Sequence, residues 1–275
     1  MKRIFTLCVT VCLVMTGFAQ TDTTGQRRTT NDTIRIGGLI IVRKPGSQNR
    51  QPGKDYQTRS RRRPSNRNIN WFVLDLGFSN YNDKSNYTTA VTSGFISPTV
   101  SEDDLKAKTL KSRNVNVWFF MQKLNIANHV LNFKYGLGLE LNNYSFDNTN
   151  LTFDKNPTFI SKVAMSEVKK SKLAADYLTL PVMLNVNFTP NRRRSYGFSA
   201  GVSAGYLYSS RFKTKGGGEI RKLKDDFNLE AFKLSYVGEL ALGRIHLYGS
   251  YAMKNMWEKG LDMSPYNFGF RFSKL

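Results

Sequence analysis

The sequence has almost no cysteine, and the little it has lies near one end. The 275 residues include two cysteines, Cys8 and Cys12, and both belong to an apolar stretch at the N-terminus. The rest of the chain therefore offers no disulfide and no thiolate for metal binding or nucleophilic catalysis. If this chain is exported, its stability must come from secondary structure and packing rather than from covalent cross-links.

Histidine is equally scarce, because the chain contains His129 and His246 and no other. Neither stands at a Ser-His or Asp-His spacing that indicates a catalytic site, and a single histidine is more often a hydrogen-bonding residue than a catalyst. The run Gly216-Gly217-Gly218 lacks the Lys-Ser or Lys-Thr that completes a phosphate-binding loop. We therefore predict a protein that is not an enzyme, with no metal site and no cofactor.

An apolar run long enough to cross a membrane as a helix is also missing. The longest stretch, residues 4–15, falls short of the ~20 residues that a spanning helix needs. It follows two basic residues and precedes Gly17-Phe18-Ala19, which has small residues where signal peptidase cuts. We predict that residues 1–19 are a secretory signal peptide. The Ser273-Lys274-Leu275 ending is then no peroxisomal address, since such an address requires a cytosolic protein.

Acidic residues are few, and the formal net charge is +21. Much of the excess lies in residues 20–68, which carry 12 Lys or Arg against 3 Asp. More lies in short predicted turns, such as the one with Arg192, Arg193 and Arg194. Nucleic acid is an unsuitable partner for an exported protein, so this charge does not predict nucleic-acid binding.

Residues 20–68 are too polar to fold alone, and we predict a basic, largely disordered periplasmic segment. It is either a solvated linker without a specific partner or a contact for cell wall or anionic headgroups. Within it, residues 33–43 form a short β-prone stretch, which predicts a small hairpin around Gly37-Gly38 or one extra strand.

Residues 69–275 show repeated alternation of apolar and polar residues, the pattern of β-strands with two unlike faces. Eight segments carry it: 71–78, 114–121, 131–142, 177–188, 196–206, 232–242, 245–253 and 266–272. The connections between them alternate between short turns and long loops, as in an outer-membrane barrel with both termini in the periplasm. We predict an all-β, transmembrane, up-and-down antiparallel β-barrel of about eight strands.

The two faces of these segments differ in charge. In the second segment, for example, the apolar face is assigned Phe119 and Met121 and the polar face Trp118 and Phe120. Across the segments the apolar face has no charge in mid-strand; its charges, such as Arg113 and Asp176, fall at strand ends. One Lys or Arg at mid-depth of the bilayer would cost ~2–4 kcal/mol, so a charge-free face favours contact with lipid over a soluble barrel of the lipocalin type.

The polar face cannot line an apolar ligand cavity, because it carries three acids and three bases among Gly, Ser and Asn. It predicts a narrow lumen filled by a structural network of salt bridges and hydrogen bonds. The members are Asp75, Lys134, Glu140, Lys233, Glu239, His246 and Arg271. Pro181 interrupts the fourth segment, and since proline removes a ladder donor, it should stand at an irregularity of the sheet.

The last segment places four aromatic residues on one face, and we predict that they form the C-terminal signal read by the barrel-insertion machinery. These are Tyr266, Phe268, Phe270 and Phe272. This segment, the signal end Gly17-Phe18-Ala19-Gln20, Tyr177–Leu184 and Phe198–Tyr206 resemble small outer-membrane barrels of the OmpX and OmpA type. They are similar, more closely, to the outer-membrane β-barrel domain family of Gram-negative bacteria that includes PorT-like proteins.

The resemblance implies an outer-membrane location with lipid as a partner. We expect a non-enzymatic barrel with a closed or nearly closed polar lumen, which has a structural, adhesive or accessory role through its long extracellular loops. The alternatives are a narrow channel or porin-like transport component, a soluble periplasmic carrier, and a lipid-modifying barrel enzyme. An eight-stranded barrel holds little more than side chains, so we do not expect a general diffusion pore.

Overall fold

The computed structural model describes residues 33–36, 39–42, 65–155, 157–163, 168–190, 195–216 and 219–273. The predicted signal peptide and most of the basic segment lie outside these residues. The short β-prone stretch forms a hairpin in which β1 (Thr33–Ile36) pairs antiparallel with β2 (Leu39–Val42). The hairpin belongs to a separate compact unit from the remainder of the chain.

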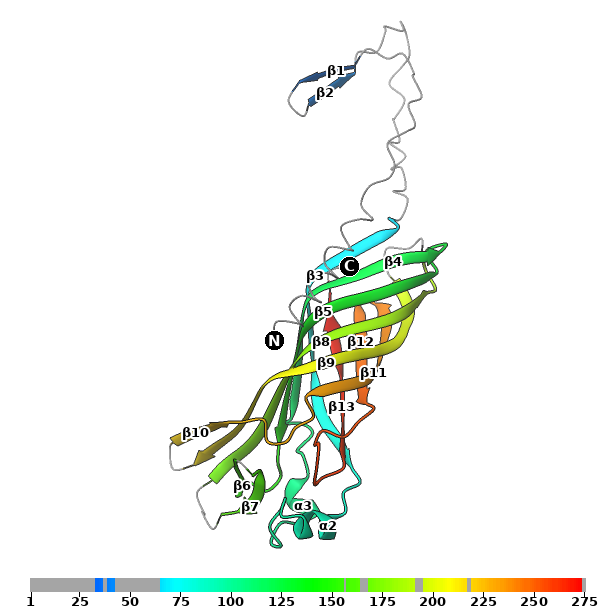
Figure 1. Cartoon of the computed structure of the whole chain (residues 1–275). Coiled ribbons are helices and arrows are strands. Elements are labelled where there is room, and N and C mark those ends of the chain that lie inside the picture. Colours follow the sequence, from blue (N-terminus) through cyan, green and yellow to red (C-terminus); the bar gives the residue numbers. More distant parts are fainter. Residues whose placement is uncertain are drawn as a thin grey trace, which may run out of the picture. The chain divides into compact units, whose positions relative to one another are not determined.

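Eight long strands form a closed antiparallel ring (Figure 1). In ring order they are β3 (Arg67–Asp83), β4 (Arg113–Ala127), β5 (Leu131–Ser145), β8 (Val168–Asn187), β9 (Ser195–Gly216), β11 (Phe232–Gly243), β12 (Ile245–Ala252) and β13 (Met263–Phe272). Each pairs with the next, and β13 pairs with β3 to close the ring. The predicted all-β up-and-down barrel is confirmed, and all eight predicted segments are strands.

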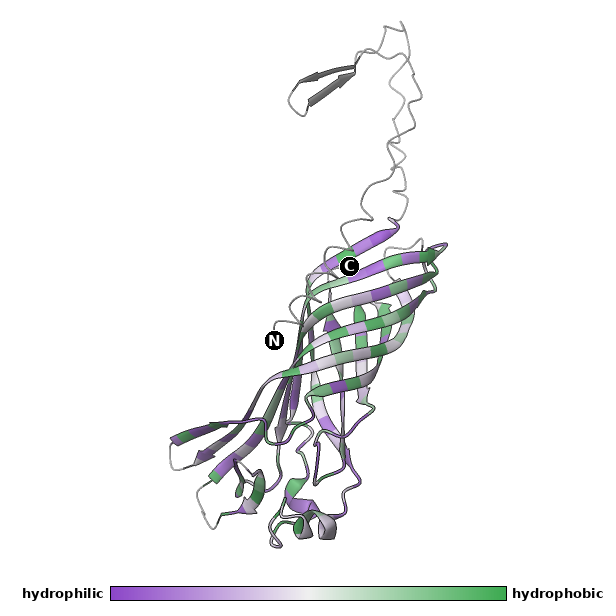
Figure 2. Cartoon of the chain, in the orientation of Figure 1, coloured by the Kyte–Doolittle hydropathy of each residue, from purple (hydrophilic) through white to green (hydrophobic). Residues whose placement is uncertain are grey.

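Period-2 alternation puts apolar side chains on the outer wall of the barrel and polar ones inside. Figure 2 shows hydrophobic and hydrophilic residues alternating along these strands. Large apolar residues are exposed outside on β3, β4, β8, β9, β11, β12 and β13, among them Leu76, Leu180, Val202, Tyr236, Leu240 and Phe270. An apolar surface of this extent marks a site of association with lipid or protein.

The predicted assignment of side chains to the inner and outer faces was wrong at one place, the second half of β4. The register between β4 and β5 shifts between Trp118 and Phe120, so an extra residue bulges at Phe119. Phe120 therefore lies outside, where its ring contacts Trp71 at 6.1 Å. Met121 lies inside and is 3% exposed, packed with Trp118. A bulge cannot be read from alternation, because every residue involved is apolar.

We expect thiol labelling to separate these two faces. In a chain without residues 1–19, which has no cysteine, Phe120→Cys should react with a membrane-dissolved maleimide, because Phe120 lies on the outer wall. Met121→Cys should be protected from that reagent, since its side chain lies inside the barrel. The measurement is labelling yield in vesicles, and the reverse pattern would show that the β4 bulge is absent.

Pro181 interrupts the ladder without shifting it. On the β5 side the paired residues break off between Tyr135↔Val182 and Gly138↔Thr179 and resume in the same register, whereas Pro181 stays paired with Ser203 of β9. The missing proline N–H therefore costs two pairs on one side only. The predicted irregularity is present, and the face assignment of β8 holds through it.

The long connections are ordered rather than simple loops. They hold α2 (Tyr87–Thr92), α3 (Glu102–Leu105), the paired strands β6 (Leu151–Asp154) and β7 (Phe159–Lys162), and β10 (Glu219–Lys224), which pairs antiparallel with the last part of β9. Figure 1 shows all of them at the same end of the barrel. We call this assembly the cap. No helix within the described residues is long and apolar enough to cross a membrane.

The cap has its own hydrophobic core, which closes this end of the barrel. Its centre is Phe153 of β6, which is 1% exposed. The Phe153 ring stacks on Phe212 at 4.3 Å between ring centroids, and also contacts Phe146, Phe227 and Trp257 within 6.0 Å. The core draws on every long connection and continues down to Tyr177 and Met263 on the barrel strands.

Candidate functional site

The interior of the barrel is filled by a charged network built on Arg271. Its Nε and Nη2 donate to the two carboxylate oxygens of Asp75 at 2.7 and 2.8 Å, across the β13–β3 pair. Its Nη1 donates to Glu239 of β11 at 2.5 Å. The planar guanidinium thus joins two buried carboxylates from strands on either side of it, a geometry that suits arginine and not lysine.

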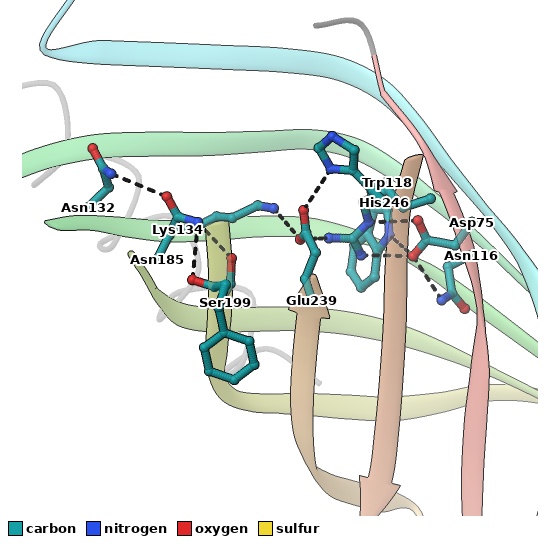
Figure 3. A network of polar contacts seen from close by, with 11 residues as sticks. Asp75, Asn116, Trp118, Asn132, Lys134, Asn185, Ser199, Glu239 and His246 are labelled. Atoms are coloured by element: carbon teal, nitrogen blue, oxygen red, sulfur yellow. Dashed lines mark hydrogen bonds and ion pairs between the residues drawn. The ribbon is translucent and has the colours of Figure 1, made fainter. Parts of the chain in front are cut away.

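Glu239 is the second junction of this network. Its carboxylate accepts from Lys134 of β5 and lies 3.2 Å from Nδ1 of His246 on β12. Figure 3 shows both side chains reaching Glu239 from different strands. A His-carboxylate pair was not predicted, because Glu239 and His246 come together only through the β11–β12 turn and the shared inward face.

A second cluster lies around Glu140 on β5. Glu140 accepts from Lys233 of β11, from Asn267 of β13 at 3.0 Å and from Asn142 at 3.1 Å. Lys233 also lies over the Tyr177 ring, 5.3 Å from its centroid. Its side chain and that of Glu140 are each 7% exposed.

Asparagines connect the two clusters; they were predicted on the inward face, but none was named as a member of the network. Asn116 donates to Asp75 at 3.1 Å, and Asn114 donates both to Asn116 and to Asn142 at 2.9 Å. Asn142 reaches Glu140, so one continuous chain of contacts joins all seven predicted lumen residues. The inward parity of the asparagines was visible in the sequence, but asparagine is common at such positions and gives no sign of its partner.

The charges of this network balance. Asp75, Glu140 and Glu239 are opposed by Lys134, Lys233 and Arg271, and each acid contacts at least one base. Moving an ion out of water costs several kcal/mol unless it is paired and hydrogen-bonded. Asp75 meets this condition most fully, because Trp118 Nε1 also donates to it at 2.7 Å and it is 0% exposed.

Two cavities lie on either side of Arg271. At the short-turn end a vestibule of about 310 Å³ is lined largely by amides and ionisable groups, including Asn68, Asn132, Lys134, Glu239, His246 and Arg271. Deeper in the lumen is a space of about 30 Å³ between Arg271 and Glu140, enough for one or two water molecules. The Arg271 side chain lies between the vestibule and this inner space. The cap core closes the opposite end of the barrel.

The remaining predicted residues lie elsewhere. Tyr266, Phe268, Phe270 and Phe272 share the outer face of β13, and the last three are 45–56% exposed. His129 stands in the β4–β5 turn with a φ of 59° and lines the vestibule. Asp176, predicted at an exposed strand end, is instead 2% exposed and paired with Arg211 at 2.6 Å.

No group of three or more His, Cys, Asp or Glu side chains that could hold a metal ion occurs in the described part of the chain. The vestibule carries His129, His246 and Glu239, of which the last two contact each other. No hydroxyl is hydrogen-bonded to Nε2 of His246, which is buried without a partner among the described residues.

In the cap, Asp104 is a local organiser. It accepts from Ser101 and Asn148 at 2.7 Å and pairs with Lys162 at 2.5 Å, so it ties α3 to β7. Burial raises the pKa of Asp104, but the hydrogen bonds from Lys162, Asn148 and Ser101 outweigh it and lower the pKa below its ordinary value. The ionised form is the one that stabilises the cap.

We expect Asp104→Asn to destabilise the cap by ~1–3 kcal/mol at pH 7, since hydrogen bonds to a charged group are lost. A carboxylate whose pKa is lowered by folding stabilises the folded state at pH values above its unfolded pKa of ~3.9. This stabilisation is lost as the pH falls from there through the folded-state pKa. The difference between variant and parent should therefore shrink below about pH 4. The measurement is the urea midpoint for protease cleavage of the cap, with trypsin at pH 7 and pepsin at pH 3.

Comparison with known proteins agrees with this architecture. No curated protein matches the sequence. A family model described as an outer membrane protein beta-barrel domain matches residues 56–253, from before β3 to the end of β12. The match spans more than half of the chain, and β13 completes the ring beyond it. The chain belongs to the outer membrane protein beta-barrel domain family.

Proposed function

We propose that the protein is a closed, non-conducting barrel of the outer membrane whose cap has a structural, adhesive or accessory role. The observation that carries this is the occupied lumen. The guanidinium of Arg271, held by Asp75 and Glu239, lies between the vestibule and the inner space. A second barrier is the cap core around Phe153. An ion would have to displace paired charges and then a packed aromatic cluster.

In this proposal the long connections are extracellular and both termini are periplasmic, after export by a signal peptide. The support is the asymmetry of the connections, since short turns face the periplasm in such barrels. The four aromatics of β13 would engage the barrel-insertion machinery. The basic N-terminal segment would be a linker or a contact for cell wall.

A non-enzymatic role is the better reading of the interior. A lipid-modifying enzyme would need a catalytic cluster at the extracellular rim, whereas His129 and His246 both line the vestibule at the opposite end. The alternative is a narrow channel, and one measurement distinguishes it from a closed barrel. The vestibule, which leads from the short-turn end to Arg271, supports this alternative.

The experiment is conductance in planar bilayers. The chain without residues 1–19 is refolded in detergent, its heat-dependent gel mobility is checked, and it is added to bilayers beside a general-diffusion porin as positive control. We expect no stepwise conductance at low or high salt. Reproducible steps that scale with protein added would overturn the closed barrel and establish the channel alternative.

A further inference from the structure

Three strands at the cap end of the barrel carry an unusual concentration of cations. Beyond the barrel, β8, β9 and β10 continue as a three-stranded sheet, seen projecting from the cap end in Figure 1. One of its faces holds Lys170, Lys172, Arg211, Lys213, Lys215, Lys222 and Lys224. We call this the lysine face.

The cations of this face stand opposite one another. Lys172 pairs in register with Lys213, and Lys213 pairs with Lys222, so three ammonium groups form a row across three strands. Adjacent strands lie ~4.8 Å apart, and like charges directly opposite each other destabilise a sheet. Burial, and then neighbouring cations including Lys170, Arg113 and Lys213, lowers the pKa of Lys172.

Nothing in the described part of the chain neutralises the row. Arg211 pairs with Asp176 at 2.6 Å, but no carboxylate of the described residues lies within 4.0 Å of Lys172, Lys213 or Lys222. This repulsion makes the sheet less stable when nothing is bound to it. An anion bound to the row would replace the repulsion by attraction.

The position of the face suggests where that anion is. On β8, Lys172 has the same parity as Leu178 and Leu180 of the outer wall, which are 40% and 46% exposed. In the barrel part of β9 the outward residues have even numbers, such as Val202. The register shift between Asp176 and Tyr177 adds one residue to β9, so beyond it the outward residues have odd numbers, and Lys213 lies on the outer side. The lysine face is therefore the continuation of the apolar outer wall.

The opposite face of the same sheet packs on the cap. Leu173 and Phe212 are 0% and 3% exposed in the cap core, and Leu223 of β10 packs against it. The three side chains lie in one cross-strand row, next to the lysine row. The sheet thus turns its apolar side to the cap and its cationic side away from it, directly beyond the lipid-facing wall.

We propose that the lysine face binds the phosphate groups of the anionic glycolipid in the outer leaflet of the outer membrane. The inference rests on the orientation given above, with the cap outside. Each basic residue near an anionic membrane surface contributes to binding, and several in one plane add their effects. Phosphates at the level of the headgroups would meet the row where the apolar wall ends.

The test is binding of purified bisphosphorylated lipid A to the refolded protein in a neutral detergent, measured by native mass spectrometry. The variant replaces the central row, Lys172→Gln, Lys213→Gln and Lys222→Gln. The control replaces three exposed cap lysines outside the face, Lys84→Gln, Lys155→Gln and Lys259→Gln, for the same change of charge. We expect the row variant to bind about tenfold or more weakly and the control to bind as the parent does.

Two further arms decide the source of the anion. Dephosphorylated lipid A should bind the parent as weakly as lipid A binds the row variant, and inorganic polyphosphate should compete only at much higher concentration. Equal binding by the row variant and the control would overturn the proposal. Polyphosphate binding as tightly as lipid A would overturn the lipid assignment in favour of a soluble polyanion. Neither result depends on conductance, so the closed-barrel proposal stands or falls separately.

A structural role for the row predicts a different outcome. If the three lysines merely held the sheet together, the row variant would make the cap more sensitive to a protease that does not cleave at lysine. Because opposed like charges are removed, we expect protease resistance to stay the same or rise in the absence of lipid. Increased sensitivity would overturn the reading of the row as a binding surface.

Discussion

Replacing Arg271 by methionine is expected to destabilise the barrel by about 3–5 kcal/mol, the usual cost of removing one partner from a buried ion pair. The change leaves Asp75 without its bidentate partner and leaves Glu239 with Lys134 and His246. Asp75 is fully buried, and water entering from the vestibule beside Arg271 would have to replace both hydrogen bonds of the guanidinium and would leave the charge uncompensated. The measurement is the urea midpoint of the folded, fast-migrating gel band after refolding.

The double variant Asp75→Asn with Arg271→Met tests whether the two residues stabilise the barrel as a pair. It removes both charges, and the amide oxygen introduced by Asp75→Asn can still accept from Trp118 and Asn116, which donate to the Asp75 carboxylate in the parent. We expect it to be less destabilised than the sum of the two single variants, with a coupling of about 1–3 kcal/mol. Arg244→Ala, at an exposed turn position next to the same strands, is the control and should change little.

Additive losses would contradict this expectation. They would mean that Arg271 and Asp75 stabilise the barrel through separate contacts, and that the layer between the vestibule and the inner space is not a unit. Arg271→Lys is informative for the same reason. One ammonium cannot replace a fork that reaches both Asp75 and Glu239, so we expect it to recover less than half of the loss.

The wall of the barrel was readable from the sequence because one simple periodicity encodes it. Leu178, Leu180 and Val182 face out and Thr179 and Pro181 face in, and alternation says so without any knowledge of the neighbours. The failure at Phe120 and Met121 has a physical cause. The bulge at Phe119 is a mismatch between two strands, and a pattern within one strand carries no information about it.

The sequence predicted the members of the lumen network but not how they pair. Inward charges stand out on a strand, so Asp75, Glu239 and Arg271 could be selected as members. Their pairing depends on which strands face each other across the ring, and Asp75 and Arg271 are 196 positions apart. The asparagine chain through Asn114 was not predicted, since a polar residue on an inward face is the default and only geometry shows which one connects two clusters.

The cap was not predicted at all, and the reason is the lack of period in its core. Leu151, Phe153 and Ile160 come from two four-residue strands, too short for alternation to be distinguished from chance. They are apolar residues in loops that were expected to carry function through exposure. Their burial instead shows that much of the long-loop sequence serves to build a lid with its own core.

Phe153→Ala is therefore expected to unfold the cap selectively. Truncating a buried phenylalanine costs about 3–5 kcal/mol, and the Phe153 ring contacts Phe227 and Trp257 from two other connections as well as Phe212 of β9. The lumen network is held by ion pairs between barrel strands, so the barrel should keep its heat-dependent gel mobility. The measurement is limited trypsin digestion of protein in vesicles, with cleavage in the cap and survival of the barrel strands.

Phe232→Ala is the matched control, because Phe232 is 62% exposed on the outer wall and its loss leaves no cavity in the cap. We expect it to digest like the parent. Phe153→Leu should fall between, since it keeps most of the buried volume. If Phe153→Ala lowers the urea midpoint of the barrel as far as Arg271→Met does, the cap and the barrel fold as one unit, and the cap is then a structural part of the wall rather than a separable extracellular surface.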